Sequence, residues 1–93
     1  MYQANPIKKA VRAAEWRAKR DGRVFDLTVD DLEVPELCPV FGTPMLRPSL
    51  DRINNNLGYT RKNTRVISWE ANRLKHALTL EQARALVRYM EGG

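Results

Sequence analysis

The stretch that most constrains this chain runs through residues 49–75, SLDRINNNLGYTRKNTRVISWEANRLK. A short alternating segment is followed by a polar loop that Gly58 closes and by a β-branched run at residues 64–67. A helical pattern then begins, for which Ser68 is a suitable N-cap. The sequence therefore predicts a β-hairpin followed directly by a helix, with the rest of the chain arranged around this unit.

Side chains of different chemistry alternate in the first predicted strand. Because successive side chains of a strand point to opposite faces, Leu50 and Arg52 should share one face while Asp51 points to the other. On the helix that follows, residues three and four positions apart share a face, so one polar and aromatic group should gather there. Its members are Trp69, Asn72, Arg73 and His76.

An amphipathic helix of about four turns is predicted before this unit. Asn5 suits its N-cap, Pro6 its first position and Gly22 its C-terminal stop. Its apolar positions are Ile7, Val11, Ala14 and Ala18, and its other side carries the cations Lys8, Lys9, Arg12, Lys19 and Arg20. Such a helix suits the backbone of DNA, and it equally suits an ordinary packed helix with a solvated basic side.

The formal net charge of +5 is unevenly distributed. Residues 1–23 carry seven Lys/Arg and two acids, residues 24–46 carry five acids and no Lys/Arg, and residues 47–93 carry nine Lys/Arg and four acids. The three parts therefore have charges of +5, −5 and +5. This pattern favours nucleic acid as the partner, because phosphate neutralisation gives affinity without sequence contacts, although a basic surface that serves only solubility has the same composition.

The acidic middle segment has a structural explanation. Residues 24–27 fit a brief extended segment, and Thr28 with Asp31 resembles a capping box for a short helical turn near residues 30–33, which Pro35 ends. Acids in a first turn are favoured by the helix dipole. We therefore expect them to support that turn and not to bind a metal ion.

The segment at residues 37–45, LCPVFGTPM, has the outline of half a zinc knuckle. A structural zinc takes four thiolate or imidazole ligands, and this chain has one cysteine and one histidine, so we expect no structural zinc. Cys38 and Phe41 are expected to be core side chains instead. A single cysteine also excludes an internal disulfide, which agrees with a reducing compartment.

The length of 93 residues predicts one domain, near the lower limit for a core without disulfides or metals. No stretch approaches the roughly eighteen unbroken apolar residues of a membrane span, and the amino terminus has no apolar run of signal-peptide type. We therefore expect a cytoplasmic protein that is not associated with a membrane.

The last predicted element is a helix at residues 79–91 with Thr79 and Gln82 as its capping box. Leu80, Ala83, Val87 and Met90 form its apolar stripe. We expect this stripe to pack behind the hairpin and helix, and it is too short to argue for a dimer seam. The expected fold is α+β: a basic helix in residues 1–23, a ββα core at residues 38–77, and a C-terminal helix at residues 79–91 that covers the core.

Three runs of the sequence, CPVFGTP, SLDRI and GYTRKNTRVISWEANRLK, resemble the HNH or His-Me finger nucleases, in particular their small phage-type branch. The resemblance covers about residues 38–75. In that family a hairpin-and-helix unit carries Asp-His on the first strand, Asn at the start of the second, and His or Asn on the helix nine residues later. The matching positions here are Asp51 with Arg52, Asn63 and Asn72.

The resemblance implies a metal-dependent DNA endonuclease or nickase that hydrolyses phosphodiester bonds. Asp51 and Asn72 would bind one divalent cation, Mg²⁺ or Mn²⁺, which prefer hard oxygen donors, and Asn63 would pin the loop and orient residue 52. A phage setting, with packaging or recombination proteins as partners, follows from the same resemblance. The residues that would contact DNA are Lys8, Lys9, Arg12, Lys19, Arg20, Arg61, Lys62, Arg65 and Arg73.

The chain departs from the family at residue 52, where Arg replaces the histidine that activates water. Arg52 stays protonated, so it cannot serve as the general base, but it can hold the scissile phosphate in a bidentate contact. His76, one turn beyond Asn72, is the histidine candidate for the base or for a third metal ligand, and the helix dipole alone also favours it there. Activation of water by the cation without a protein base is a further alternative.

These residues also have purely structural interpretations. Asp51 can cap a turn, residues 54–56 are turn formers, and Asn63 can join the loop to the strand. Their combined spacing is what favours the nuclease unit. Two other functions stay open: a non-catalytic DNA-binding protein on an HNH-like scaffold, which the arginine at position 52 favours, and a protein that binds and inhibits another protein.

Overall fold

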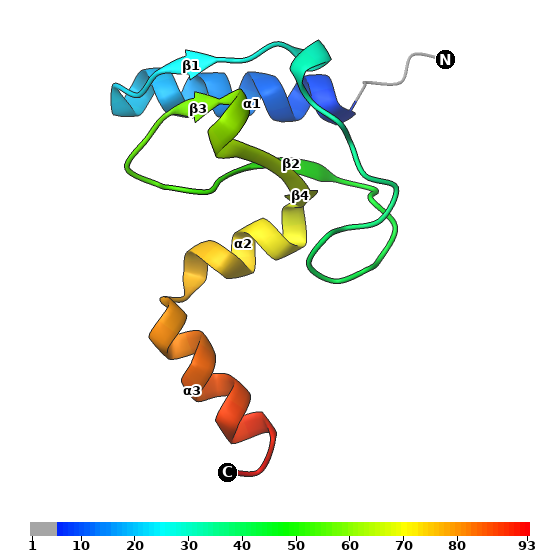
Figure 1. The fold of residues 1–93 in the computed structure, drawn as a ribbon, viewed down its shortest axis with the longest axis vertical. Coiled ribbons are helices and arrows are strands. Elements are labelled where there is room, and N and C mark those ends of the chain that lie inside the picture. The colour runs from blue at the N-terminus through cyan, green and yellow to red at the C-terminus, as the bar shows by residue number, and fades with distance from the viewer. Residues whose placement is uncertain (1–5) are drawn as a thin grey trace.

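The computed structural model describes residues 6–93 (Figure 1). Its α+β class is the predicted one, a small single domain in which helices flank a β-hairpin core. The expected N-cap of the first helix, Asn5, lies outside the described residues. The elements in chain order are α1 (Pro6–Asp21), β1 (Phe25–Asp26), the 3-10 turn η1 (Val29–Asp31), β2 (Pro48–Arg52), β3 (Tyr59–Thr60), the 3-10 turn η2 (Arg61–Asn63), β4 (Thr64–Ser68), α2 (Trp69–Ala77) and α3 (Leu80–Met90).

The predicted hairpin is formed by β2 and β4, which pair antiparallel with Asp51 opposite Arg65. Ser68 is both the last residue of β4 and the N-cap of α2, because its hydroxyl accepts a hydrogen bond of 3.1 Å from the N–H of Ala71. Such a cap contributes about 1 kcal/mol to a helix. The hairpin therefore passes into the helix without an intervening residue, as the sequence predicts.

A second pair of strands, β1 and β3, is parallel and two residues long. It depends on Gly58, since a Cβ at that position would overlap the backbone of Val24. The next N–H, that of Tyr59, donates to the carbonyl oxygen of Val24 over 2.9 Å. The polar loop is thus fastened to the segment that follows α1, a contact between distant parts of the chain that local signals do not show.

The main core lies between α1 and the hairpin. The apolar side of α1 packs inward as predicted, with Val11 only partly buried. Gly22 ends the helix at a φ of 67°, and the N–H of Arg23 donates to the carbonyl oxygen of Ala18 over 2.8 Å. The buried residues of this core are Ile7, Ala14, Ala18, Leu27, Leu50, Tyr59 and Val66.

A smaller core cluster on the α2 side of the hairpin contains Cys38, Ile67 and Ala71. Cys38 is buried as expected, but the expectation for Phe41 is wrong, since Phe41 is 49% exposed. The reason is a tight turn, in which the N–H of Gly42 donates to the carbonyl oxygen of Cys38 over 2.8 Å and Gly42 has a φ of 70°. This turn points the cysteine inward and leaves the phenylalanine outside.

The short turn in the acidic segment lies at Val29–Asp31, slightly before its predicted place. The N–H of Thr28 donates to the carboxylate of Asp31 over 2.9 Å, which is the predicted capping contact.

The C-terminal helix departs from its predicted position. α3 has the predicted capping box, in which Thr79 and Gln82 exchange hydrogen bonds of 3.1 and 2.9 Å, yet none of its residues is buried. Figure 1 shows it leading away from the hairpin, at the opposite end of the molecule from α1. The expectation that it covers the core is wrong, because α1 and α2 already pack against the hairpin and the extended backbone of Leu78 turns the chain outward.

No helix within residues 6–93 is both long and apolar enough to cross a bilayer.

Candidate nucleic-acid and metal site

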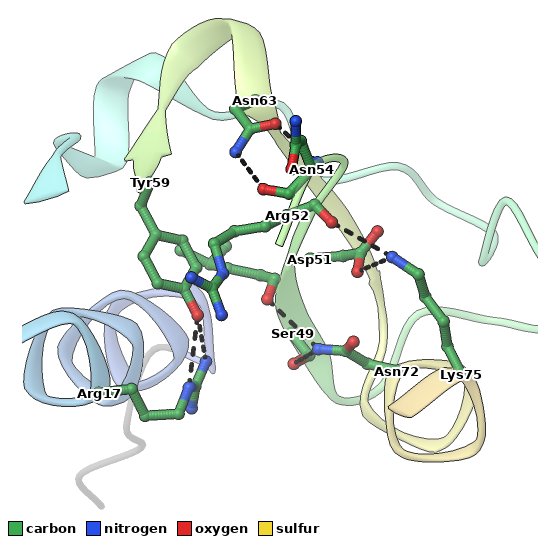
Figure 2. Close-up of polar contacts among 10 residues, drawn as sticks. Arg17, Ser49, Asp51, Arg52, Asn54, Tyr59, Asn63, Asn72 and Lys75 are labelled. Carbon is green, nitrogen blue, oxygen red and sulfur yellow. Dashed lines mark hydrogen bonds and ion pairs between the residues drawn. The ribbon is translucent and has the colours of Figure 1, made fainter. Parts of the chain in front are cut away.

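β2 separates two groups of polar side chains, as its alternation predicts (Figure 2). On one face, Leu50 belongs to the core that includes α1, and Arg52 lies over the ring of Tyr59. On the other face, Ser49 and Asp51 contact residues of α2. Residues of both groups nevertheless border one pocket, since Ser49 and Arg52 both line it.

A pocket of about 320 Å³ lies where α1, β2, β3 and α2 come together. It contains the group that the helix pattern predicts, since Trp69, Asn72, Arg73 and His76 all line it. Arg52 joins them from β2, and two further residues, Arg17 and Tyr59, enter from α1 and β3. This pocket, called the arginine pocket, thus holds Arg17, Arg52 and Arg73 from three different elements.

Tyr59 positions two of these arginines. Its hydroxyl oxygen accepts hydrogen bonds from Nε and Nη2 of Arg17 at 3.4 and 3.3 Å. The guanidinium of Arg52 lies 5.0 Å from the centre of the tyrosine ring, and its Nη1 donates to the carbonyl oxygen of Leu57 over 3.2 Å. Because Tyr59 is only 4% exposed, it is a fixed support that holds Arg52 over its ring and Arg17 at its hydroxyl.

Arg73 is the third arginine, and its guanidinium lies 5.1 Å from the ring centre of Trp69. Among residues 6–93, neither Arg17, Arg52 nor Arg73 forms an ion pair with a carboxylate. Three guanidiniums without a counter-charge at one pocket attract an anion, and their planar donors match the oxygens of a phosphate. This arrangement is therefore a candidate phosphate-binding site.

Asn72 contributes an orphaned polar atom to the same place. Its Nδ2 donates to the hydroxyl of Ser49 over 2.8 Å and to the carbonyl oxygen of Leu50 over 3.3 Å. Because a carbonyl oxygen can only accept, this contact fixes the orientation of the amide. Oδ1 is then buried and has no hydrogen-bond partner within the part of the chain that the structure describes. A buried, unsatisfied oxygen is costly, and a hard cation is one ligand that would satisfy it.

Asp51, the other predicted metal ligand, is 6% exposed and forms an ion pair. The Nζ atom of Lys75 lies 2.6 Å from its Oδ1 and also donates to the carbonyl oxygen of Arg52 over 3.2 Å. Asp51 does not line the arginine pocket but a neighbouring, largely apolar groove. Figure 2 shows the carboxylate of Asp51 turned toward Lys75, whereas the amide of Asn72 is turned toward Ser49.

Asn63 has the contacts that a loop-pinning residue needs. Its Oδ1 accepts from the N–H of Asn54 over 2.9 Å, and its Nδ2 donates to the carbonyl oxygens of Asn54 and Gly58 over 3.0 and 2.8 Å. The loop between β2 and β3 is thereby tied at both ends to η2. Since that loop begins directly after Arg52, Asn63 fixes the exit of the strand that carries the arginine.

The other predicted DNA contacts fall into two groups. The five cations of α1, namely Lys8, Lys9, Arg12, Lys19 and Arg20, are exposed, although Arg20 pairs with Asp21 over 3.0 Å. The hydrogen bond from Arg20 lowers the pKa of the Asp21 carboxyl. Arg61 and Arg65 share a surface hollow with the acids of residues 30–33, so they lie away from the arginine pocket. Lys62 is exposed on η2.

Three residues of this region were not foreseen from the sequence: Arg17, Tyr59 and Lys75. Arg17 follows Ala14 of the apolar stripe by three positions and so borders that stripe, and its side chain is half-buried. Lys75 follows Asn72 by three positions and so shares its helix face. Tyr59 gave no comparable signal, because its position depends on the unpredicted pairing of β1 with β3.

Cys38 lies in the smaller core cluster, apart from these groups. Burial raises the pKa of its thiol, but hydrogen bonds with Ser68 and with the backbone of Phe41 and Val40 lower it more strongly, to about 7.

Within residues 6–93 there is no group of three or more His, Cys, Asp or Glu side chains placed to hold a metal ion.

Comparison with protein-family models, with curated proteins and with solved structures gives no match to this chain.

Proposed function

We propose that this chain is a metal-dependent DNA endonuclease or nickase that hydrolyses phosphodiester bonds. The observation that carries the proposal is the pocket where three arginines without carboxylate partners meet Asn72, whose buried Oδ1 has no partner in residues 6–93. The arginines supply what a phosphate requires, and the amide oxygen supplies what a hard cation requires. The resemblance of the same hairpin and helix to HNH nucleases supports combining the two.

DNA would enter along the basic side of α1, whose exposed cations give affinity for the phosphate backbone. One phosphate would then lie in the pocket against Arg52, with Arg17 and Arg73 beside it. Arg52 is suited to orient this phosphate, because its guanidinium is already held by Tyr59 and by the carbonyl oxygen of Leu57. An arginine fixed before binding loses less side-chain entropy when the phosphate arrives.

The residues present fit a divalent cation such as Mg²⁺ or Mn²⁺. Asp51 and Asn72 would hold it through carboxylate and amide oxygens, the donors that these ions prefer. When bound, the cation would stabilise the charge that develops on the phosphate and on the departing oxygen. His76 is exposed, lines the pocket, and is the histidine able to take a proton from water at a ring nitrogen.

A second candidate function is DNA binding without cleavage. The specific observation in its favour is the ammonium group of Lys75, which lies 2.6 Å from Asp51 at the place where a cation would approach the carboxylate. The arginine at position 52 points the same way, because it cannot act as a base. In this version the arginine pocket holds a phosphate and no hydrolysis follows.

The deciding experiment is incubation of supercoiled plasmid with the protein in Mg²⁺, Mn²⁺ or EDTA, followed by separation of nicked and linear products. Nicking that needs the metal and is lost in Asp51→Asn would support the nuclease. His76→Ala would test the candidate general base, Arg52→Ala would test the phosphate contact, and Arg84→Ala on α3 is the control for loss of a surface charge. If the plasmid is shifted on a gel but never cut with either metal, the second candidate holds.

A further inference from the structure

The ion pair between Lys75 and Asp51 is asymmetric in its exposure. The side chain of Asp51 is 8% exposed, whereas that of Lys75 is 43% exposed. Lys75 therefore extends from the surface of α2 over a carboxylate buried against β2, as Figure 2 shows. Its ammonium group also donates to the carbonyl oxygen of Arg52 over 3.2 Å, so it spans the two residues of the strand end.

A buried carboxylate needs a counter-charge, and within residues 6–93 only Lys75 forms an ion pair with Asp51. Arg65, which lies opposite Asp51 in the strand register, is exposed and makes no such pair. One carboxylate oxygen of Asp51, Oδ1, is thus already in contact with a protein cation at 2.6 Å. An ammonium group and a divalent cation cannot be equally close to the same oxygen without strong repulsion.

We propose that Lys75 is a built-in competitor for the divalent cation: it occupies the cation position at Asp51 in the metal-free protein and is displaced when the metal binds. The inference rests on the proposed function, because the cation is the one that Asp51 and Asn72 would hold. The long, half-exposed stem of Lys75 allows the ammonium group to move into solvent while α2 stays in place.

The competition has two consequences. The apparent metal affinity is the intrinsic affinity multiplied by the fraction of time that Lys75 leaves the carboxylate open. A lysine that is bound about nine-tenths of the time therefore weakens metal binding about tenfold. Displacement also breaks the hydrogen bond between Lys75 and the carbonyl oxygen of Arg52. Metal binding at Asp51 would therefore release a contact at the residue that holds the phosphate.

The first test measures Mn²⁺ binding alone, by the loss of the free-ion signal in electron paramagnetic resonance. Lys75→Met should bind Mn²⁺ about tenfold more tightly than the wild type. Lys62→Met is the matched control, since it removes the same charge from an exposed residue without an ion pair to Asp51 and should change the affinity little. If Lys75→Met binds no more tightly than Lys62→Met, the inference is overturned.

The second test uses the wild-type sequence, so its result does not depend on the stability of a variant. The ε-amine of Lys75 is acylated with an amine-reactive reagent, and its rate is followed by mass spectrometry relative to that of Lys62. Saturating Mg²⁺ should accelerate acylation of Lys75 at least several-fold and leave Lys62 unchanged. An unchanged ratio would mean that Lys75 stays on Asp51, and the inference would fail.

The outcomes separate this inference from the proposed nuclease. Metal-dependent plasmid nicking by the wild type, without tighter Mn²⁺ binding in Lys75→Met, would keep the nuclease and reject the competitor. Tighter Mn²⁺ binding in Lys75→Met, with no nicking under any condition, would keep the competitor and reject the nuclease.

Discussion

The hydroxyl oxygen of Tyr59 accepts two hydrogen bonds from the guanidinium of Arg17, a residue forty-two positions earlier in the chain. Through this contact the basic helix α1 supplies a cation to the pocket formed by the hairpin and α2. The same ring lies under the guanidinium of Arg52. Two like charges are thus held together at one tyrosine, and an anion bound between them would relieve their repulsion.

Arg17→Met should weaken binding of a short DNA duplex about fivefold at low salt, because a charge-assisted phosphate contact at a half-exposed position is lost. The slope of log affinity against log salt concentration should fall in magnitude by about one. Fluorescence anisotropy at several salt concentrations measures both quantities. Arg84→Met, which removes one charge from exposed α3, should leave affinity and slope nearly unchanged. Equal losses in the two variants would show that only net charge matters.

Asn63→Ala should lower the free energy of unfolding by about 2–4 kcal/mol, since three hydrogen bonds of a buried amide are removed together. Urea denaturation followed by circular dichroism gives the value. Asn55→Ala, in the exposed turn of the same loop, is the control and should cost less than about 0.5 kcal/mol. A small effect of Asn63→Ala would mean that the loop is not fixed by this side chain.

Gly58→Ala should destabilise the fold by about 3 kcal/mol or more, because the new methyl group would overlap the backbone of Val24 and push β1 from β3. The melting temperature, measured by calorimetry, is the direct readout. Gly93→Ala adds the same methyl group at the chain end, where there is space for it, and should leave the melting temperature unchanged. Comparable melting temperatures for both variants would contradict the close approach at Gly58.

The thiol of Cys38 predicts a pH dependence of stability. Its pKa in the folded protein, about 7, lies below the ordinary value of 9.0. The folded state therefore binds fewer protons than the unfolded state between these values, and stability rises with pH from about 7 to about 9. The contribution is complete above the unfolded pKa and is lost as the pH falls through about 7. Denaturation curves at pH 6, 7, 8 and 9 should show this rise in the wild type but a flatter profile in Cys38→Ala.

Contacts within a few residues account for the parts of the fold that sequence patterns predicted. The cap of α2 by Ser68 and the exchange between Thr79 and Gln82 are local hydrogen bonds, so their residue types identify them. The inward stripe of α1 follows from helical periodicity alone. Of the candidate site, the clustering of Asn72, Arg73 and His76 was predictable for the same reason.

The position of α3 was not predictable in this way. Its stripe shows that one side is apolar, but periodicity does not say whether a partner surface is available. Leu80 is 68% exposed and Met90 is 75% exposed, because the hairpin is already covered elsewhere. The amphipathic pattern therefore identified the helix but did not show which surface, if any, its apolar side packs against.

The sequence by itself determined the hairpin, the helix that follows it and the basic side of α1, because each depends on local periodicity or on a hydrogen bond between nearby residues. The spacing of Asp51, Asn63 and Asn72 is likewise read directly from the chain. Only the tertiary structure decided that Arg17 joins Arg52 at Tyr59 and that Lys75 lies on Asp51. The contact of Arg17 with Tyr59 joins residues 42 positions apart, and that of Lys75 with Asp51 joins residues 24 positions apart. Both contacts depend on how α1 and α2 pack against β2. Which charges meet is therefore set by packing between distant segments, which no local signal encodes.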